Sequence, residues 1–306
     1  LPELSREYPG ELPGCDNQYS TQHRFLNLEP EELPHLEQID GTVAVLAGLS
    51  GNVYFHWMVD ILPRVEILLS SGVNIEAIDW FLINSYQQPF QRETLQALGI
   101  PESKIIESDN YPYIQAKQLI VPSFSGYLGW LSPRGLEFLR QVFLNKKFHQ
   151  LCSANISIAR GTPVSQQDDR KYNYPDRIYI SRSKCSYRRV INEEKVIEFL
   201  SGFGFVSVLL ESMSFAEQIT LFSRAKVIVV PHGSGLTNII FCGKGTKIIE
   251  LVSPNYIRHY YWAIAQQLNL EHYYITGESF NCYPIRQLMY QNPLTEDILV
   301  NLNSLK

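Results

Sequence analysis

The sequence predicts an α/β protein made of two Rossmann-like halves, each with a parallel sheet, that face a central cleft. Apolar runs of strand length alternate along the chain with segments whose apolar residues recur at helical spacing. A polar, turn-rich stretch at 150–176 separates two such series. The chain has 306 residues, 45% of them apolar, which is enough for two cores. We therefore expect an N-terminal domain over 1–165 and a C-terminal domain over 166–306, with the last helix packing back on the N-terminal domain.

The first series follows a loop-rich lead-in over residues 1–40. A β-branched apolar run at 42–49 predicts a strand. A helix is expected over 53–69, with Asn52 as its N-cap and Pro63 as a kink or break. The other elements expected in this half are strands at 80–84, 104–106 and 118–121 and helices at 92–98 and 132–148.

The second series repeats the alternation of strands and helices. Its expected strands lie at 177–181, 205–210, 226–231 and 247–251. Its expected helices lie at 192–200, 214–224, 260–268 and from about 236 onward. Because ligands of open parallel sheets bind beyond the carboxyl ends of the strands, the residues that follow these strands are the first candidates for a site.

Charge and composition exclude several classes of protein. The chain has 26 Lys and Arg against 31 Asp and Glu, a net charge of -5, which argues against a broad nucleic-acid surface. No apolar run approaches the 18 residues or so that would span a bilayer. The five cysteines are far apart and form no C-x-x-C, so neither a disulfide framework nor a structural zinc site is expected, although one or two bridges remain open.

The segment VIVVPHGSGLTN at 227–238 predicts a strand, a glycine-containing turn and a helix. Gly233 and Gly235 would let backbone amides approach a ligand closely, and a helix N-terminus suits a phosphate. The residues expected to bind there are His232, Gly233, Ser234, Gly235, Leu236, Thr237 and Asn238. The alternative is an ordinary strand–turn–helix junction with a capping serine.

A second candidate segment, at 178–194, concentrates positive charge behind a predicted strand. Arg182 directly follows the strand, and Arg188 and Arg189 lie a few residues on. Arginines offer fixed bidentate donors, so such a cluster can neutralise a diphosphate without a metal ion. The alternative is a solvated basic turn paired with Glu193 and Glu194, in which one of Arg188 and Arg189 is structural.

A third candidate is the pair His56 and Asp60, which would share one face of the predicted helix. A His–carboxylate pair can act as a general base. The spacing also permits two metal ligands, but no third is evident. Two alternatives remain: Asp60 pairs with Arg64 one turn on, or His56 is a core residue with its hydrogen bonds satisfied.

The three segments together resemble the family-61 glycosyltransferases. The matching motifs are N-x-x-x-H-W-x-x-D-x-L-P at 52–63, Y-I-S-R with a later Arg and N-E at 179–193, and P-H-G-S-G-L-T-N followed by I-I-E-L at 231–251. Their order and spacing are also similar to that family, and the resemblance covers roughly residues 40–255.

The resemblance implies a GT-B fold and an inverting hexosyl- or pentosyltransferase. The donor would be a nucleotide-sugar, in this family usually a UDP-sugar, and the acceptor a hydroxyl on a glycan or protein, as in polysaccharide biosynthesis or protein glycosylation. No cofactor and no obligatory metal are expected, and the sequence contains no D-x-D of the kind that holds a divalent ion on a nucleotide diphosphate.

A single displacement assigns each candidate residue a role. Arg182, one or both of Arg188 and Arg189, and the 232–238 loop would stabilise the departing diphosphate. Glu250 is a candidate for the ribose hydroxyls. Asp60 is the preferred base with His56 assisting, and the reverse assignment is open. Asn52 and Trp57 would lie on the acceptor side.

Two other functions compete with this one. A serine hydrolase could use Ser234, with Glu250 and either His259 or His272 completing a triad, although the full G-x-S-x-G is missing. A non-catalytic sugar or nucleotide binder is the second, since aromatic residues, which can stack on sugars, make up 12% of the chain.

The expected compartment follows from weaker signals. The chain begins with Leu1, its first residues do not form a signal peptide, and it is compact beside eukaryotic family members. We expect a bacterial protein in the cytoplasm, with or without membrane association, or a Golgi or ER lumenal protein if the chain is a trimmed eukaryotic one. The oligomeric state is open.

Overall fold

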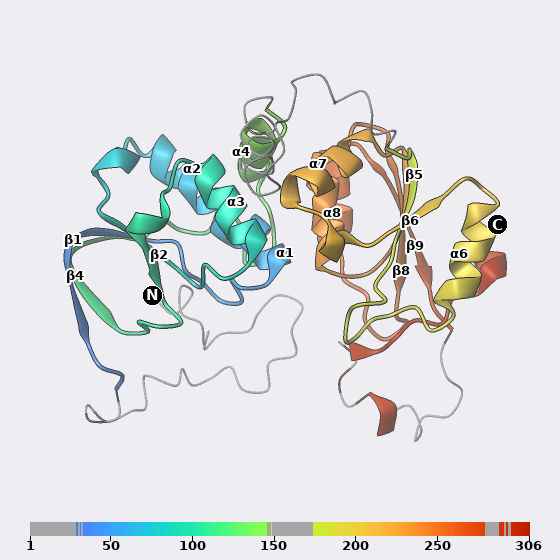
Figure 1. Cartoon of the computed structure of the whole chain (residues 1–306), viewed down its shortest axis with the longest axis horizontal. Coiled ribbons are helices and arrows are strands. Elements are labelled where there is room, and N and C mark those ends of the chain that lie inside the picture. The colour runs from blue at the N-terminus through green and yellow to red at the C-terminus, as the bar shows by residue number, and fades with distance from the viewer. Residues whose placement is uncertain are drawn as a thin grey trace, which may run out of the picture. The chain divides into compact units, whose positions relative to one another are not determined.

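The computed structural model describes residues 29, 31, 33–145, 148, 174–278, 288–290, 292 and 295–306 (Figure 1). The chain divides into two compact units, Leu1–Leu151 and Cys152–Lys306. The predicted domain boundary at 165/166 lies outside the described residues. None of the helices in the described ranges is long and apolar enough to cross a membrane. Each unit contains one parallel sheet, so the α/β class is confirmed.

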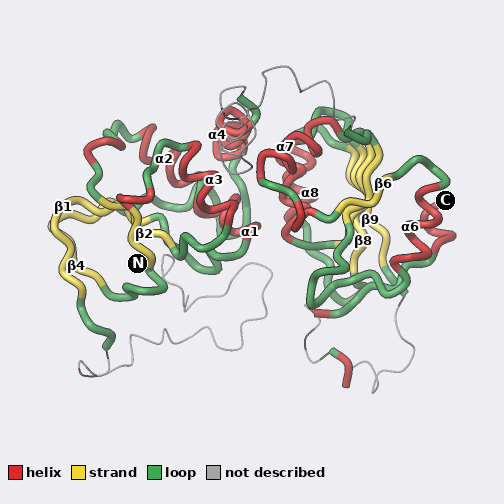
Figure 2. The backbone as a smooth tube through the Cα atoms, viewed as in Figure 1, coloured by secondary structure: helices red, strands yellow, loops and turns green. Residues whose placement is uncertain are grey.

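The first unit has a four-stranded parallel sheet in the order β3-β2-β1-β4 (Figure 2). Its strands are β1 (Glu37–Val45), β2 (Trp80–Ile83), β3 (Ile105–Glu107) and β4 (Ile114–Ile120). Its helices are α1 (Tyr54–His56), the π-helix η4 (Trp57–Ile61), α2 (Pro63–Ser70), η5 (Ile75–Ala77), α3 (Pro89–Ala97), η6 (Glu102–Lys104) and α4 (Pro133–Phe143). After β1 the chain adds β2 and β3 on one side of that strand and then places β4 on its other side, so the strand order reverses between β1 and β4. Ligands of open parallel sheets bind at such a switch point.

Two expectations for the first unit need correction. β1 begins and ends earlier than the predicted strand at 42–49, with a shift in its register against β4 between Ile39 and Thr42, where Gly41 has φ +103°. The predicted helix over 53–69 does break at Pro63, as expected: Pro63 stands at the first turn of α2, and the part before it consists of α1 and the π-helix η4. The N-cap residue of α1 is Val53 instead of Asn52.

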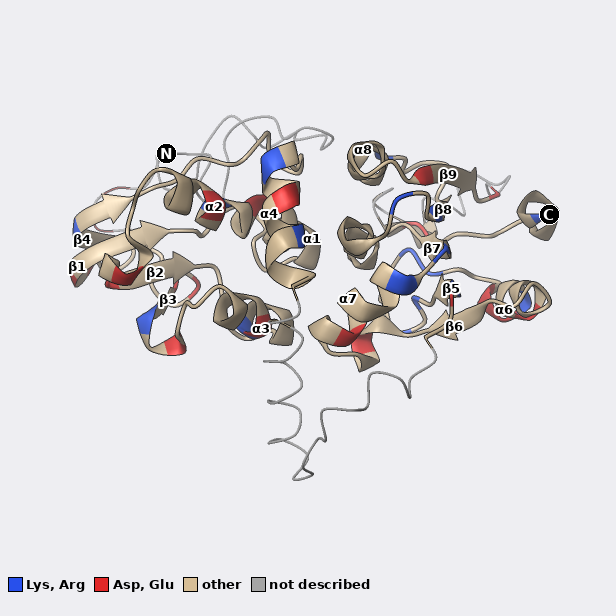
Figure 3. Cartoon of the chain, turned by 90° about the horizontal axis from the view of Figure 1, so that it is seen from above, with Lys and Arg blue, Asp and Glu red and all other residues tan. Residues whose placement is uncertain are grey.

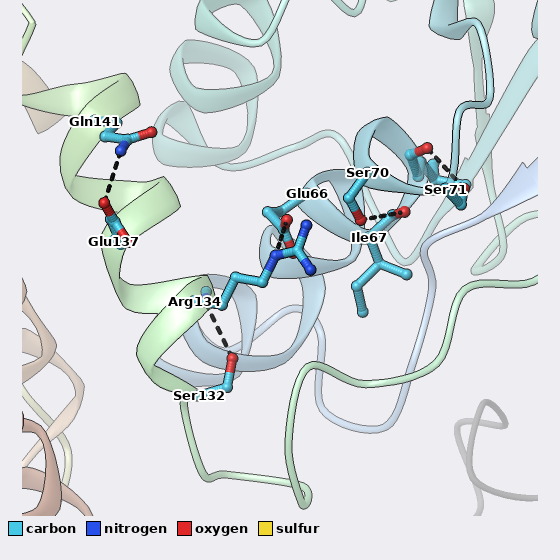
Figure 4. Close-up of polar contacts among 10 residues, drawn as sticks. Glu66, Ile67, Ser70, Ser71, Ser132, Arg134, Glu137 and Gln141 are labelled. Atoms are coloured by element: carbon cyan, nitrogen blue, oxygen red, sulfur yellow. Dashed lines mark hydrogen bonds and ion pairs between the residues drawn. The ribbon is translucent and has the colours of Figure 1, made fainter.

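Polar contacts fasten α4 to α2 within the first unit. Arg134 Nε donates to Glu66 Oε1 over 2.6 Å, joining the first turns of the two helices (Figure 4). The Ser132 hydroxyl caps α4 by accepting from the Gly135 N–H, as the sequence predicts for a Ser-Pro start. α4 ends at Phe143, short of the predicted end at 148.

The second unit has a five-stranded parallel sheet in the order β6-β5-β7-β8-β9, which switches direction between β5 and β7. Figures 1 and 3 show α7 and α8 on one face of this sheet and α6 on the other. The strands are β5 (Arg177–Ile180), β6 (Val206–Val208), β7 (Val227–Pro231), β8 (Lys247–Val252) and β9 (Glu271–Thr276). The helices are α6 (Glu193–Ser201), η8 (Leu210–Ser212), α7 (Phe215–Arg224), the 3₁₀-helix η9 (Ser234–Phe241), α8 (Tyr260–Gln267) and η11 (Leu302–Leu305).

The end of the chain belongs to the second unit. Ile298 and Val300 are part of the apolar cluster that Val196 and Leu200 of α6 form with the sheet, and η11 packs against it through Leu302 and Leu305. The expected packing of the last helix on the N-terminal domain stays a prediction. The GT-B arrangement itself stays a prediction.

Candidate active site

Arg64 joins the carboxyl ends of β1 and β4 at the switch point of the first sheet. Its side chain is fully buried and donates to the carbonyl oxygens of Leu46 and Ala47 over 2.8 Å and of Pro122 over 2.7 Å. Burial lowers the pKa of Arg64 to about 10, so the group stays charged at neutral pH. The guanidinium donates to these carbonyls and Asp60 bonds other groups, so the two side chains form no hydrogen bond, although the Asp60 charge favours the charged form of Arg64.

His56 and Asp60 form a hydrogen-bonded pair, as their spacing predicts. His56 Nδ1 lies 2.7 Å from Asp60 Oδ2, and the second oxygen, Oδ1, accepts from the Gly129 N–H over 2.7 Å. Asp60 is 1% exposed, whereas the His56 side chain is 26% exposed. The pair lies at the π-turn η4, where Leu62 N–H bonds Trp57 O, a feature frequent at functional sites. The buried carboxylate can thus hold the proton on Nδ1, leaving Nε2 to accept one.

The two residues expected on the acceptor side have different surroundings. Trp57 is fully buried, and its indole N–H donates to Thr94 Oγ1 over 3.0 Å. It is a core residue, and its predicted contact with an acceptor is wrong because no face of the ring is accessible. Asn52 is exposed and donates to Asp109 Oδ2 over 2.8 Å. Its predicted contact with an acceptor stays open.

Sequence reasoning missed the loop that follows β4. Its Gly129 N–H binds the Asp60 carboxylate, and the same loop carries Tyr127, which is 79% exposed, and Trp130, which is 37% exposed. The available signal was the run SGYLGW at 125–130, shortly after the strand predicted at 118–121. This loop places two accessible aromatic side chains within a few residues of the Asp60 contact.

Arg182 and Gly233 meet at the switch point of the second sheet. Each lies two residues beyond the end of its strand, and β5 and β7 are paired in parallel. Arg182 Nε donates to Arg188 O over 3.1 Å and its terminal nitrogen Nη2 to Tyr187 O over 3.1 Å. A Cβ at Gly233 would collide with the Arg182 guanidinium, so any larger residue there would have to displace the end of the Arg182 side chain. The two separate sequence motifs therefore form one surface.

His232 and Glu250 lie beneath this surface in a buried network. His232 Nδ1 bonds Glu250 Oε1, and His272 Nε2 bonds Glu250 Oε2 over 2.9 Å. Burial raises the pKa of Glu250, but the hydrogen bonds from the two histidines outweigh it and leave the pKa below its ordinary value. Glu250 is 1% exposed, and each of its oxygens bonds a histidine. This geometry does not favour the predicted contact with ribose. It indicates that Glu250 orients His232.

The structure corrects the predicted ligand contacts of three residues after the glycine turn. Leu236, Thr237 and Asn238 are fully buried, and Asn238 Nδ2 donates to Gln218 Oε1 over 2.9 Å. They lie in the 3₁₀-helix η9, which begins at Ser234, slightly before the helix predicted from about 236, and the Leu236 N–H already bonds Gly233 O. Their side chains serve the core, which leaves Ser234 and Gly235 as the partly exposed part of the turn.

Arg188 and Arg189 have different surroundings. Arg189 bonds Asp297 Oδ2 over 2.7 Å, and its backbone N–H also bonds that carboxylate. This pair ties the terminal segment to the loop after β5, which gives Arg189 a structural role in place of the predicted donor contact. Arg188 has φ +53° and places its guanidinium 4.8 Å from the centre of the Tyr187 ring. The positive charge of Arg188 therefore stays available to a ligand.

Other predicted features of the site concern metals and hydrolysis. Within the described ranges, no group of three or more His, Cys, Asp or Glu side chains could hold a metal ion. Metal independence stays a prediction. Glu250 does bond His272, but no hydrogen bond connects Ser234 with His259 or His272 in the part of the chain that the structure describes. The triad that a serine hydrolase requires is therefore not assembled.

Comparisons with known proteins give the same family as the motifs. The family model for glycosyltransferase 61 matches residues 54–249. Two plant β-1,2-xylosyltransferases are similar: that of Arabidopsis thaliana is 33% identical over 98 residues, and that of Oryza sativa subsp. japonica 27% over 95 residues. Each match covers 28% of this chain and only 18% of the relative.

Among solved structures, D-2-hydroxyisocaproate dehydrogenase superposes over 88% of this chain and 91% of its own at 11% identity. Its TM-score of 0.23 is too low to support an argument. The family match, in contrast, covers more than half of the chain and includes the His56–Asp60 pair, Arg182 and the turn at Gly233. The chain belongs to the glycosyltransferase 61 family.

Proposed function

We propose that this chain transfers a sugar from a nucleotide-sugar, with UDP as the nucleotide, to an acceptor hydroxyl on a glycan or protein, with inversion at the anomeric carbon. Family membership and the two plant xylosyltransferases support glycosyl transfer and make UDP-xylose the first donor to test. The observation that carries the proposal is the contact of Arg182 with Gly233, which puts a guanidinium at the switch point where a parallel sheet binds its ligand.

The departing diphosphate is stabilised by arginine side chains in this proposal. Arg182 is held by two backbone carbonyls, and so its orientation is fixed before a ligand arrives. Arg188 shares the Tyr187 ring with it, since the two guanidinium carbons lie 5.8 and 4.8 Å from the ring centre. Positive charges arranged in advance can replace a divalent ion, so we propose that transfer needs no metal.

His56 is the base in this proposal, and Asp60 positions it. The sequence favours Asp60 as base, but both oxygens of its carboxylate are hydrogen-bonded and buried. The acceptor hydroxyl gives its proton to His56 Nε2 while the hydroxyl oxygen forms a bond to the anomeric carbon. The bond from that carbon to the diphosphate breaks at the same time, and its electron pair leaves with the diphosphate. Asp60 stabilises the imidazolium that forms.

The acceptor side uses exposed aromatic rings in this proposal. Tyr127 and Trp130 belong to the loop that binds Asp60 through Gly129. Aromatic faces stack on the apolar faces of sugar rings, and Trp57, which the sequence favours, is buried. The GT-B arrangement and the compartment, whether bacterial cytoplasm or a Golgi or ER lumen, stay predictions.

A transfer assay tests the proposal. The protein is incubated with UDP-xylose and other UDP-sugars, a panel of glycan and peptide acceptors, and excess EDTA. Release of UDP with formation of a product of inverted anomeric configuration is expected, and Arg182→Ala should abolish both. Activity lost in EDTA and restored by manganese would contradict metal independence. Labelling of Ser234 by a fluorophosphonate would support a serine hydrolase. Tight binding of a nucleotide-sugar without turnover would support a non-catalytic binding protein.

A further inference from the structure

Tyr256, in the segment after β8, lies between the loops that carry the candidate donor site. The guanidinium carbon of Arg258 is 4.7 Å from the centre of its ring, and that of Arg188 is 5.3 Å away. The His232 ring packs edge-on against the same ring at 5.2 Å. Tyr256 therefore connects Arg258, which sequence reasoning did not single out, to two residues of the predicted donor site.

Hydrogen bonds to the Glu296 carboxylate hold the turn before Tyr256 in place. The Ser253 hydroxyl donates to Glu296 Oε2 over 3.0 Å, and Asn255 Nδ2 donates to the same oxygen over 2.9 Å. Ser253 and Tyr256 also form an antiparallel bridge. The backbone that carries Tyr256 is thus held in place before any ligand binds.

Neither arginine on the Tyr256 ring has a protein partner for its charge. Within the described residues, the side chains of Arg188 and Arg258 form no hydrogen bond and no ion pair, and the buried Nε of each is unsatisfied. Arg189, in contrast, is neutralised by Asp297. Buried polar groups normally find a partner, so two buried and unsatisfied Nε atoms beside one ring point to an anion as their partner.

The set extends to a third cation. Arg182 and Arg188 share the Tyr187 ring, and Arg188 and Arg258 share the Tyr256 ring. The side chains of these three arginines have no carboxylate partner among the described residues, and Figure 3 shows blue Lys and Arg segments near β7 and β8. The three positive charges repel one another, and a ligand with a single negative charge offsets this repulsion only in part. Two linked phosphates offset more of it and offer oxygens to more of the donors.

We propose that Arg258, stacked on Tyr256 beside Arg188, is a further ligand of the donor's phosphates and makes the site select a diphosphate over a monophosphate. This inference rests on the proposed function and adds to it a residue and a preference for nucleoside diphosphate-sugars over donors linked through one phosphate. Tyr256 is a positioning residue, since it acts by holding the two guanidiniums.

Calorimetry with uridine, UMP and UDP tests the inference. The wild type should bind UDP more tightly than UMP. Arg258→Ala should weaken UDP binding by about 10- to 100-fold, shrink the UDP preference, and leave uridine binding within about twofold. The matched control is Arg224→Ala, because Arg224 also stacks on a tyrosine, Tyr174, at 5.3 Å but lies outside the site. Tyr256→Phe should retain the preference, and Tyr256→Ala should reduce it.

Pyrophosphate and phosphate, used as probes without a nucleoside, separate this inference from the proposed function. If the wild type prefers pyrophosphate and Arg258→Ala loses that preference, the inference stands even if UDP is not the nucleotide. Unchanged UDP and pyrophosphate affinity in Arg258→Ala would overturn the inference while the proposed function stood. Failure of the wild type to bind any of these anions would overturn both. Arg258→Gln replaces the alanine variant if that variant does not fold, as judged by its melting temperature.

Discussion

The guanidinium of Arg182 occupies the space that a side chain at Gly233 would need. Arg182 follows β5, Gly233 follows β7, and these two strands flank the switch point of the second sheet. Arg182 is anchored on its other side by the carbonyls of Tyr187 and Arg188. Two motifs whose contacting residues are 51 positions apart in the sequence thus depend on each other for their shape.

Replacing Gly233 by alanine should therefore impair the donor site. The added methyl group would force Arg182 out of its position, because the carbonyls on its other side leave it little room. We expect UDP affinity to fall at least about tenfold, with a loss of stability of about 1–3 kcal/mol. Isothermal calorimetry and thermal melting measure the two effects. Gly243→Ala is the control, since a Cβ there meets nothing within 4 Å. Equal UDP affinity in both variants would contradict the role of the contact.

His56 and Asp60 should differ in their effect on turnover. His56→Ala should lower kcat by about 10²–10⁴-fold, the range expected for loss of a general base. Asp60→Asn should lower kcat less, because the base remains but loses its orienting carboxylate. Both variants should bind UDP as the wild type does. Single-turnover assays with saturating donor measure these rates. A His56 variant within a few-fold of wild type would exclude His56 as the base.

Arg189 should matter for stability and little for the donor. Arg189→Ala breaks the bond to Asp297, which holds the terminal segment against the loop after β5. We expect a loss of about 1 kcal/mol, because the arginine side chain is half exposed, and an unchanged UDP affinity. Arg188→Ala, the adjacent residue, should show the opposite pattern. Thermal melting and calorimetry on both variants provide the comparison, and a strong UDP defect in Arg189→Ala would refute the assignment.

The second unit should lose stability at acid pH because of Glu250. Burial raises its pKa, yet the bonds from His232 and His272 outweigh this effect and hold the pKa below the ordinary 4.5. A carboxyl group whose pKa is lower in the folded state contributes stability above pH 4.5, and that contribution is lost as the pH falls through the folded pKa.

Calorimetric melting of the wild type and Glu250→Gln across pH measures this effect. The wild type should be more stable by about 3 kcal/mol near pH 7, and the difference should shrink below pH 4.5. Glu271→Gln, on the neighbouring strand with a half-exposed side chain, should show almost no difference. A difference between wild type and Glu250→Gln that does not vary with pH would argue against the charged network.

Tyr127 should act on the acceptor alone. Tyr127→Ala should raise the KM for the acceptor by about 3- to 10-fold, since a stacked aromatic ring contributes roughly 1 kcal/mol, and should leave the KM for the donor unchanged. Tyr111→Ala is the control, because Tyr111 is also exposed in this unit but lies outside the loop that binds Asp60. Equal acceptor kinetics in both variants would remove Tyr127 from the acceptor site.

The sequence was sufficient for most of the elements and for the contact between His56 and Asp60, because these follow from local chemistry. Apolar periodicity located most of the strands, Pro63 marked a break in a predicted helix, and Ser132 marked a helix start, each through the preference of a single residue. The spacing of His56 and Asp60 predicted their contact, since four residues make one helical turn. The motif order identified the family, which the family match confirms.

The tertiary structure decided which side chains face a ligand, because burial depends on packing between segments far apart in the sequence. In the folded chain Trp57 and Asn238 are buried in the core, and Arg189 forms an ion pair with Asp297. His272 bonds Glu250 because β8 pairs with β9. The fold also brought Arg258 and Arg188 to one ring, although they lie 70 residues apart. The local sequence cannot specify such contacts, because which side chains meet depends on the order of the strands in the folded sheet.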